Sequence, residues 1–301
     1  MGRSATRWCD QGMATTLDDP GTTDLDEALT VLRSWQDDRT PLQLHPGDVA
    51  WRERVGLGAA AAALRVWRRE GRILALGMLD APDLLRLAID PEAFQDEELA
   101  RRVVDDLADE ACGVLPAGEA YLETPNGTVL HDVVLTAGWE PGESWTPLRR
   151  DLAEPVPDPG LRIAVVEPED VHDRVAVHRA SFPGSTFTED GWRLVAATGA
   201  YDDARCLVAY DDAGSSVAAA TVWSAGEGRP GLLEPVGVHS DHRGHGYGTA
   251  ISLAAARALR ELGSSSAIVC TPASNVAAVA TYRAAGFIPE DLRLDAARAA
   301  G

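Results

Sequence analysis

The feature that most restricts the fold of this chain is a glycine-rich segment, RGHGYG, at residues 243–248. It follows an apolar run, Leu232–Val238, that is typical of a strand, and it precedes an apolar pattern with the spacing of an amphipathic helix. Glycines let the backbone turn tightly and expose successive N–H groups, to which the positive end of the following helix adds. Such a strand–loop–helix unit predicts a site for an anion such as a pyrophosphate.

Two better-known phosphate motifs do not fit this segment. A nucleotide P-loop requires Gly-Lys-Ser or Gly-Lys-Thr, and the sequence contains no lysine. A dinucleotide fingerprint has the spacing G-x-G-x-x-G and an acidic residue at the end of the next strand. Here the glycines alternate, and the next apolar run, SAIVCT, ends without an acid.

A proline-rich segment, DLAEPVPDPG, divides the chain into two halves of domain size. We expect residues 1–152 and 161–301 to form separate domains joined by a linker at 153–160. The segment TPNGTVLHDVVLTAGW of the first half can be laid over TPASNVAAVATYRAAGF of the second with one gap. This similarity favours two copies of one fold, and chance likeness of two mixed α/β halves is the alternative.

Hydrophobic periodicity predicts the same order of elements in both halves. In the first half we expect strands at 64–70, 72–79, 84–90 and 119–125, and helices at 96–111 and 128–136. In the second half we expect strands at 161–167, 205–212, 216–224, 232–238, 266–271 and from about 287, and helices at 170–180, 192–198, 251–262 and 275–285.

The formal net charge of −20 disfavours partners that are themselves anionic, namely nucleic acid and acidic membranes. It suits a cationic substrate such as an amine, although acidity that only maintains solubility is the simpler explanation. The first residues have no apolar core typical of a secretory signal, and no apolar run reaches the length of a membrane span. The four cysteines (Cys9, Cys112, Cys206 and Cys270) lie too far apart in sequence for a metal motif and fit buried thiols in a reducing cytoplasm.

Several positions match the signature of one enzyme family. Arg243, Gly246 and Gly248 fit the pattern of Arg or Gln, two residues, Gly, one residue, then Gly or Ala, and VGVHSDH is a usual lead-in. Asn275, Tyr282 and the pair Gly286-Phe287 fit a second block downstream. The segment Leu161–Gly301 therefore resembles the GNAT superfamily of acyl-CoA-dependent N-acyltransferases. Length and layout are similar to those of bacterial tandem members such as mycothiol synthase.

The resemblance implies an α/β (α+β) fold in two tandem copies, each with flanking helices around a mixed, mostly antiparallel central sheet in which two parallel strands splay apart. It implies acetyl-CoA as co-substrate, bound by main-chain groups in that cleft, and no metal. A Cβ at Gly246 is expected to crowd the turn. The cofactor-binding residues implied are Val236, Gly237, Val238, Arg243, Gly244, Gly246, Tyr247, Gly248, Thr249 and Asn275.

The same reaction needs a neutral amine and a proton for the departing thiolate. Tyr282 matches a family position that often carries the acid, and helix packing is its alternative role. Glu234 is the candidate base, because it lies four residues ahead of Val238 and regular alternation would point both to one face. A solvated strand-end glutamate is equally consistent, and His239 or His242 could relay protons instead.

The resemblance leaves the acceptor open. Residues 181–187, Trp192 and Trp223 are expected to contribute to its pocket, although core packing explains any one of these aromatic residues. In the first half, PEAFQDEEL follows the equivalent strand with four carboxylates and no glycine, and Val134 replaces Tyr282. We therefore expect one acetyl-CoA per chain, bound by the second half, and a monomer or homodimer that acetylates a primary amine of a small molecule. Acetylation of proteins and non-catalytic sensing of acyl-CoA are the alternatives.

Overall fold

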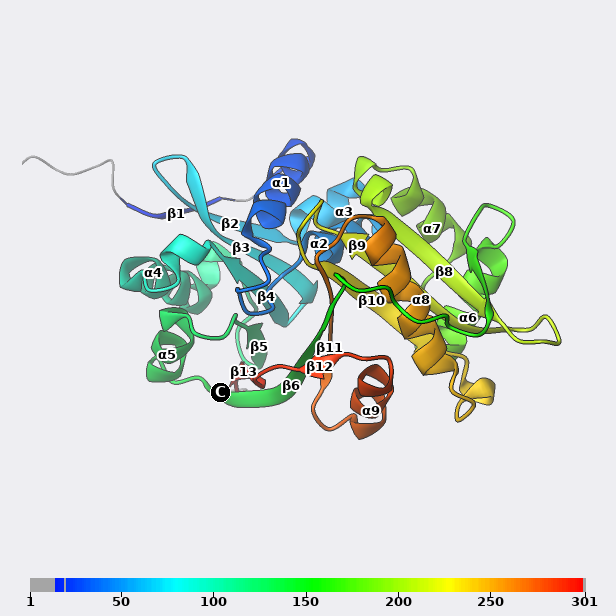
Figure 1. Ribbon diagram of the computed structural model, residues 1–301. Coiled ribbons are helices and arrows are strands. Elements are labelled where there is room, and N and C mark those ends of the chain that lie inside the picture. Colours follow the sequence, from blue (N-terminus) through cyan, green and yellow to red (C-terminus); the bar gives the residue numbers. More distant parts are fainter. Residues whose placement is uncertain (1–13, 19, 300–301) are drawn as a thin grey trace, which may run out of the picture.

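The computed structural model describes residues 14–18 and 20–299, so Cys9 and the N-terminal segment lie outside the described residues. Within this part of the chain the strands form one 13-stranded mixed sheet. Its strand order is β1-β2-β3-β4-β5-β13-β6-β11-β10-β9-β8-β7, and β12 pairs with β6 off this path. Figure 1 shows helices on both sides of the sheet along its length.

The predicted elements occur in the predicted order, and the first half also contains two strands, β1 and β6, that were not predicted. The first half contains β1 (Thr16–Asp18), β2 (Leu64–Arg69), β3 (Arg72–Ala81), β4 (Leu84–Ile89), β5 (Ala120–Glu123), β6 (Glu140–Asp151), α1 (Leu25–Trp35), α2 (Pro46–Arg52), α3 (Leu57–Ala62), α4 (Glu97–Ala108) and α5 (Val129–Thr136). The second half contains β7 (Arg162–Val165), β8 (Ala204–Tyr210), β9 (Ser216–Ser224), β10 (Gly231–Val238), β11 (Ser266–Pro272), β12 (Ile288–Pro289), β13 (Arg293–Arg298), α6 (Val171–Ser181), α7 (Glu189–Ala196), α8 (Tyr247–Glu261) and α9 (Val276–Ala284).

Each half has one pair of parallel strands that separate along their length. In the second half β10 and β11 are paired only at Gly231–Ala267 and Leu232–Ile268, and the rest of β10 has no ladder with β11. In the first half β4 and β5 are paired over three residues at the equivalent place. The remaining pairs are antiparallel. The predicted fold class, a mixed sheet with splayed parallel strands and flanking helices, is therefore confirmed.

The two halves exchange strands across the sheet. The first part of β6 pairs with β13 from the C-terminal end of the chain, and β13 also pairs with β5. The second part of β6 pairs with β11 and β12 of the second half. Figure 1 shows β6 running between the halves with β11, β12 and β13 beside it. The backbone pairing thus crosses the predicted linker in both directions.

The apolar cores follow the same arrangement. Helices α4 and α5 cover one face of β2–β5, and α1, α2 and α3 cover the other. In the second half α8 and α9 cover one face, and α6 and α7 cover the other. The core beneath α1 and α2 continues into the second half through Trp223, Leu232 and Ile268, so the halves share buried surface as well as strands.

Some elements differ from the sequence-based expectation. Helices α1, α2 and α3 were not predicted. The short helix expected at 192–198 is α7, which begins at Glu189. The hydroxyl of Thr188 accepts a hydrogen bond from the Gly191 amide and caps this helix at its N-terminus. The helix expected at 96–111 ends at Ala108, and a separate 3-10 turn follows it. The last strand was expected near Phe287, but it is divided into β12 and β13.

The strand exchange predicts that neither half folds alone. A fragment of residues 1–152 lacks β13, and a fragment of residues 161–301 lacks β6, so each leaves buried strand edges without partners. We expect each fragment to lack a cooperative thermal transition by circular dichroism and the two to recover it when co-expressed. As a control, the intact chain cut at a protease site placed between Pro157 and Asp158 should keep its transition, because both residues are exposed. A cooperative transition in either isolated fragment would contradict the prediction.

Candidate active site

The glycine-rich loop has the backbone that an anion cradle requires. Gly244 and Gly246 adopt φ of 82° and 81°, a region that residues with a Cβ rarely adopt. Gly246 is the N-cap of α8 and has no side chain to cap it, so the first N–H groups of this helix stay available. No atom lies within 4 Å of a Cβ placed on Gly246. The expectation that a Cβ would crowd the turn was wrong, because the constraint is the backbone angle.

The ten residues predicted to bind the cofactor line one cavity of about 620 Å³. Tyr282, which was predicted to be the acid, also lines it. The chain contains 47 aspartates and glutamates, yet none of them is in this lining. The charged member is Arg243, whose guanidinium donates to the Ser181 carbonyl at 3.2 Å. No carboxylate in the lining of this cavity would therefore repel an anion, although the protein as a whole is strongly acidic.

Two further glycines let the walls of this cavity approach one another. A Cβ on Gly237 would lie 2.6 Å from the Ser181 side chain at the end of α6. A Cβ on Gly248 would lie 2.9 Å from the Thr281 methyl group on α9. Asn275 caps α9 by accepting a hydrogen bond from the Ala278 amide at 3.2 Å. These positions shape the groove through main-chain packing, as the sequence analysis implied for a main-chain site.

Glu234 does not follow the regular alternation that the sequence analysis assumed. The register of β10 against β9 shifts between Leu233 and Val236, so Glu234 lies in a bulge and the same-face argument with Val238 was wrong. Val236 and Val238 pack into the core beneath α8, and the Glu234 carboxylate instead contacts Arg86. The Glu234 side chain is 40% exposed, so one part of it is open to a substrate.

Arg86 is a buried residue of β4, in the first half, that sequence reasoning missed. Its guanidinium lies 3.0 Å from Glu123, 3.1 Å from Asp48, 3.4 Å from Glu234 and 4.0 Å from Asp80. Against the effect of burial, these carboxylates raise the pKa of Arg86 well above its ordinary value, so it stays charged. The polar cluster around Glu234 is thus built from both halves.

Tyr282 is buried where α9 meets the cavity. Burial raises the pKa of its phenol well above the ordinary value, and the nearby charges of Glu234 and Cys270 add to this effect. The phenol therefore keeps its proton, as an acid must. Its ring also makes an edge contact with Phe287, with 5.9 Å between centroids, so the alternative packing role has support of its own.

Aromatic residues from both halves lie beside this cavity. Phe182 lines the cavity and lies 4.9 Å from His178, which in turn lies 4.9 Å from Phe187. Trp51 of α2 completes the group at 4.9 Å from Phe187. Burial, followed by the charges of Arg174 and Arg54, lowers the pKa of His178 to about 3, so this imidazole is neutral.

The other predicted pocket residues and relays lie elsewhere. Trp192 and Trp223 are 7% and 2% exposed and belong to the cores, so packing accounts for both. His239 accepts a hydrogen bond from the Asp241 amide at 3.2 Å, and neither His239 nor His242 lines the cavity.

Burial raises the pKa of Cys270 to about 12, which fits an inert thiol. The described residues contain no group of His, Cys, Asp and Glu that could hold a metal ion.

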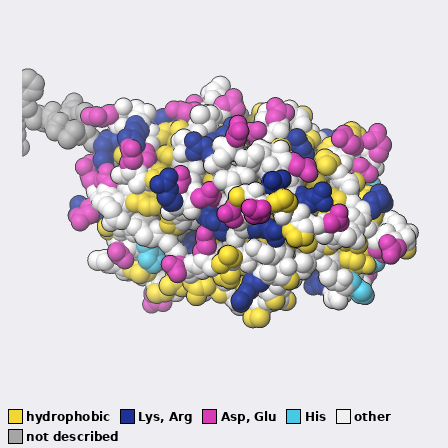
Figure 2. Space-filling model, in the orientation of Figure 1, with side chains coloured by type: hydrophobic (Ala, Val, Ile, Leu, Met, Phe, Trp, Pro, Cys, Tyr) yellow, Lys and Arg dark blue, Asp and Glu magenta, His cyan; other side chains and the backbone are white. Residues whose placement is uncertain are grey.

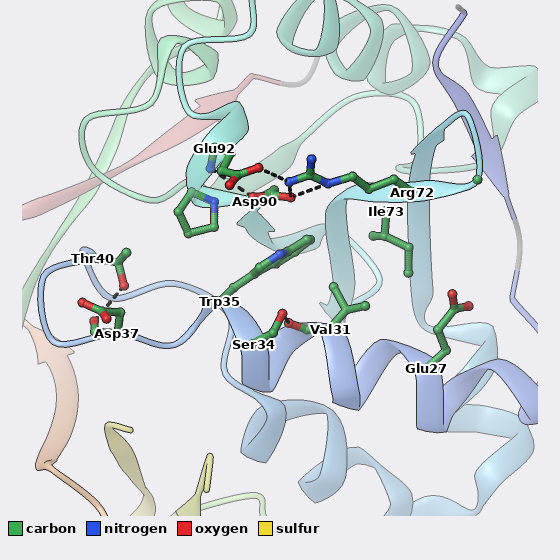
Figure 3. A pocket seen from close by; sticks show the side chains of 12 residues that line it. Glu27, Val31, Ser34, Trp35, Asp37, Thr40, Arg72, Ile73, Asp90 and Glu92 are labelled. Carbon is green, nitrogen blue, oxygen red and sulfur yellow. Dashed lines mark hydrogen bonds and ion pairs between the residues drawn. The ribbon is translucent and has the colours of Figure 1, made fainter. Parts of the chain in front are cut away.

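The equivalent loop of the first half is acidic instead of glycine-rich. Asp90 and Glu92 follow β4 and line a separate cavity of about 620 Å³, together with Glu27 and Asp37. Figure 3 shows Arg72 reaching both Asp90 and Glu92, with Trp35 below them. This cavity shares no residue with the glycine-rich one. Of the carboxylates in PEAFQDEEL, Glu92 lines this cavity, and Arg72 pairs with both Glu92 and Asp90. That this loop rejects a pyrophosphate stays a prediction.

Charge on the visible surface is mixed. Figure 2 shows acidic and basic side chains interspersed on one face, without a basic patch there. No helix among the described residues has the length and apolar character needed to cross a membrane.

Comparison with known proteins identifies the family to which the second half is similar. Residues 173–287 match the model of the Acetyltransferase (GNAT) family, a segment that holds both β10 and the glycine-rich loop. No curated protein matches the chain.

Solved structures share the fold over nearly the whole chain. A tandem GNAT protein from the clavulanic acid biosynthesis pathway has a TM-score of 0.64 at 18% identity, with 96% of this chain and 99% of its own covered. The GCN5-related N-acetyltransferase from Sphaerobacter thermophilus has a TM-score of 0.60 at 17% identity, with 94% and 95% covered. A GNAT-family acetyltransferase from Colwellia psychrerythraea has a TM-score of 0.60 at 12% identity, with 94% and 98% covered. The chain thus combines a segment that matches the GNAT family with a fold that a tandem GNAT protein shares, which supports acyl transfer in general.

The loop geometry predicts the effect of a charge at Gly246. Gly246→Asp should lower the affinity for acetyl-CoA by roughly 100-fold or more, because like charges in contact cost several kcal/mol. Isothermal titration calorimetry measures this affinity, and for the parent protein we expect one acetyl-CoA per chain.

The matched control is Gly214→Asp, in the turn between β8 and β9. Gly214 has a φ of 85° and no atom within 4 Å of a built Cβ, so the backbone penalty is the same without a nearby cavity. Equal affinities of the two variants would remove the loop from the cofactor site. Binding of two acetyl-CoA molecules per chain would show that the acidic loop after Asp90 does not prevent binding.

Proposed function

We propose that this protein is an N-acetyltransferase that moves an acetyl group from acetyl-CoA to a primary amine of a small molecule. The observation that carries the proposal is the single cavity lined by all ten predicted cofactor residues and Tyr282, with no carboxylate in its lining. The match of residues 173–287 to the GNAT family supports it independently.

The proposed reaction proceeds by direct attack within a ternary complex. The ammonium form of the acceptor loses a proton to Glu234, directly or through water, and becomes nucleophilic. The nitrogen then bonds to the thioester carbonyl carbon and loses its second proton to solvent, and the carbon–sulfur bond breaks with its electron pair on sulfur. Tyr282 donates its proton to the thiolate, and the proton held by Glu234 returns to Tyr282 through solvent, so that one proton is released for each amide formed. The exposed N–H groups at the start of α8 hold the pyrophosphate.

The bulge in β10 and the aromatic group beside the cavity support a small acceptor. Glu234 stands at the bulge, where it is partly exposed. Phe182, which lines the cavity and is 37% exposed, offers an aromatic face to an apolar or cationic acceptor. An amine on a sugar-derived thiol precursor is one candidate, by analogy with the tandem layout of mycothiol synthase. We further propose a cytoplasmic monomer or homodimer without nucleic acid or membrane partners.

Release of free CoA thiol tests the proposal directly. The purified protein should release thiol from acetyl-CoA in the presence of at least one member of a panel of amino acids, polyamines, aminoglycosides and aminosugars. Release with peptides alone would favour the protein acetyltransferase. Tight acetyl-CoA binding with no release from any acceptor, including peptides, would favour the sensor and refute catalysis.

The position of Tyr282 predicts a large loss of turnover without a loss of binding. Tyr282→Phe keeps the ring against Phe287 but removes the proton, so kcat should fall by about 10²- to 10⁴-fold. The acetyl-CoA dissociation constant and Tm should stay close to those of the parent. Because the raised pKa of Tyr282 keeps it protonated, the parent should show no descending limb from this residue below about pH 10, the ordinary value for tyrosine.

Tyr210→Phe is the control for loss of a buried phenol oxygen. The Tyr210 hydroxyl donates to Asp173 at 2.9 Å, outside the cavity, so its removal should affect stability more than kcat. A Tyr282→Phe variant that turns over within about threefold of the parent would assign Tyr282 to packing, because general acid catalysis contributes far more.

A further inference from the structure

The register of the two parallel strand pairs makes Arg86 and Glu234 equivalent positions of the two halves. In the first half Leu84, the first residue of the segment LLR, pairs with Tyr121. In the second half Leu232, the first residue of the segment LLE, pairs with Ile268. Counting two residues onward reaches Arg86 in one half and Glu234 in the other. The first half therefore carries a cation where the second carries the candidate base.

These two equivalent residues contact one another. Arg86 Nη1 lies 3.4 Å from Glu234 Oε1, so the splayed strands of the two halves approach each other at this point. Arg86 is 10% exposed, and its position is fixed by contacts from three other elements of the first half. A guanidinium held in this way offers a fixed hydrogen-bond donor and a fixed charge.

Arg86 is shared among four carboxylates, two of which, Glu123 and Asp48, are buried. Glu123 has a second cation, Arg293, whose Nη2 lies 2.9 Å from its carboxylate. Burial raises the pKa of Asp48, with Arg86 opposing the effect. Of the two partners that reach solvent, Glu234 lies closer to Arg86, at 3.4 Å, than Asp80, at 4.0 Å.

We propose that Arg86 is a positioning residue, supplied by the half without the glycine-rich loop, that holds the Glu234 carboxylate in place to take the proton of the acceptor. This inference rests on the proposed acetyl transfer. A fixed hydrogen-bond donor limits the orientation of the carboxylate that it contacts. The first half thereby contributes to the chemistry although its own loop is acidic.

A purely structural role for Arg86 makes a different prediction. In that case the guanidinium only neutralises buried carboxylates, and its removal lowers stability without a specific effect on Glu234.

The first experiment observes Glu234 without any activity. The side-chain carboxyl carbon is followed by 13C NMR in the full-length protein at one fixed pH and assigned by its absence in Glu234→Gln. In Arg86→Gln its resonance should move, because the carboxylate loses its fixed donor. In Arg86→Lys, which keeps a donor and the charge, the resonance should stay closer to that of the parent. The same resonance position in the parent and Arg86→Gln would overturn the inference.

The second experiment follows turnover with an acceptor from the amine panel. In Arg86→Gln the kcat should fall by about tenfold or more, because misplacement of a reacting group is costly, with the acetyl-CoA dissociation constant unchanged and part of the loss recovered in Arg86→Lys. Adding Arg86→Gln to Glu234→Gln should cost little further activity, because both changes act on one group. Additive losses would show that Arg86 does not act through Glu234.

Two further variants separate this effect from general destabilisation. Arg33→Gln removes an ion pair that also joins the halves, 2.8 Å from Asp203, and should lower Tm without a comparable loss of kcat. If Arg86→Gln does not fold, the pair Arg86→Gln/Asp48→Asn removes one cation and one buried acid together, and the same change in the Glu234 resonance is expected. A parent protein that transfers to no amine would refute the proposed function, whereas the NMR measurement would still decide whether Arg86 positions Glu234.

Discussion

The backbone pairing of β6 is the constraint on which the rest of the structure depends. This strand supplies hydrogen-bond partners to β13 with its first part and to β11 and β12 with its second. Buried peptide groups must be paired, so the sheet of each half is complete only with a strand from the other. The splayed openings at β4/β5 and β10/β11 are therefore held in a fixed relation, which brings Arg86 to Glu234. The proposed catalytic carboxylate depends on this relation.

The two cavities differ in the charge of the residues that line them. The protein carries a formal charge of −20, and the cavity beside the first-half loop is lined by four carboxylates. The cavity at the glycine-rich loop contains none. A pyrophosphate would therefore meet less repulsion in the second cavity than in the first, and the net negative charge would favour the approach of the proposed amine acceptor in its protonated form. One protein can thus suit both an anionic donor and a cationic acceptor.

The local sequence pattern was sufficient to predict much of the fold and the residues that line the glycine-rich cavity. Gly244 and Gly246 have a positive φ that other residues rarely adopt, and a Cβ on Gly248 would lie 2.9 Å from the Thr281 methyl group. The loop and the start of α8 could therefore be predicted from the sequence. The strand exchange was not readable, because β12 and β13 are short and their partners lie more than a hundred residues away. Likewise the bulge at Glu234 broke the alternation on which its predicted orientation rested. Arg86 lay in a half without a motif, and the one available signal was the alignment of LLR with LLE.

The opposite charges at equivalent positions have an evolutionary consequence. After a duplication, two identical copies would present the same side chain on both sides of this contact. Two glutamates would repel at this distance, and two arginines would leave no base. Once one copy carried arginine and the other glutamate, reversion of either single residue would place like charges together. The division of labour between the halves would then be difficult to undo one substitution at a time, and the loops could diverge freely into one that admits a phosphate and one that rejects it.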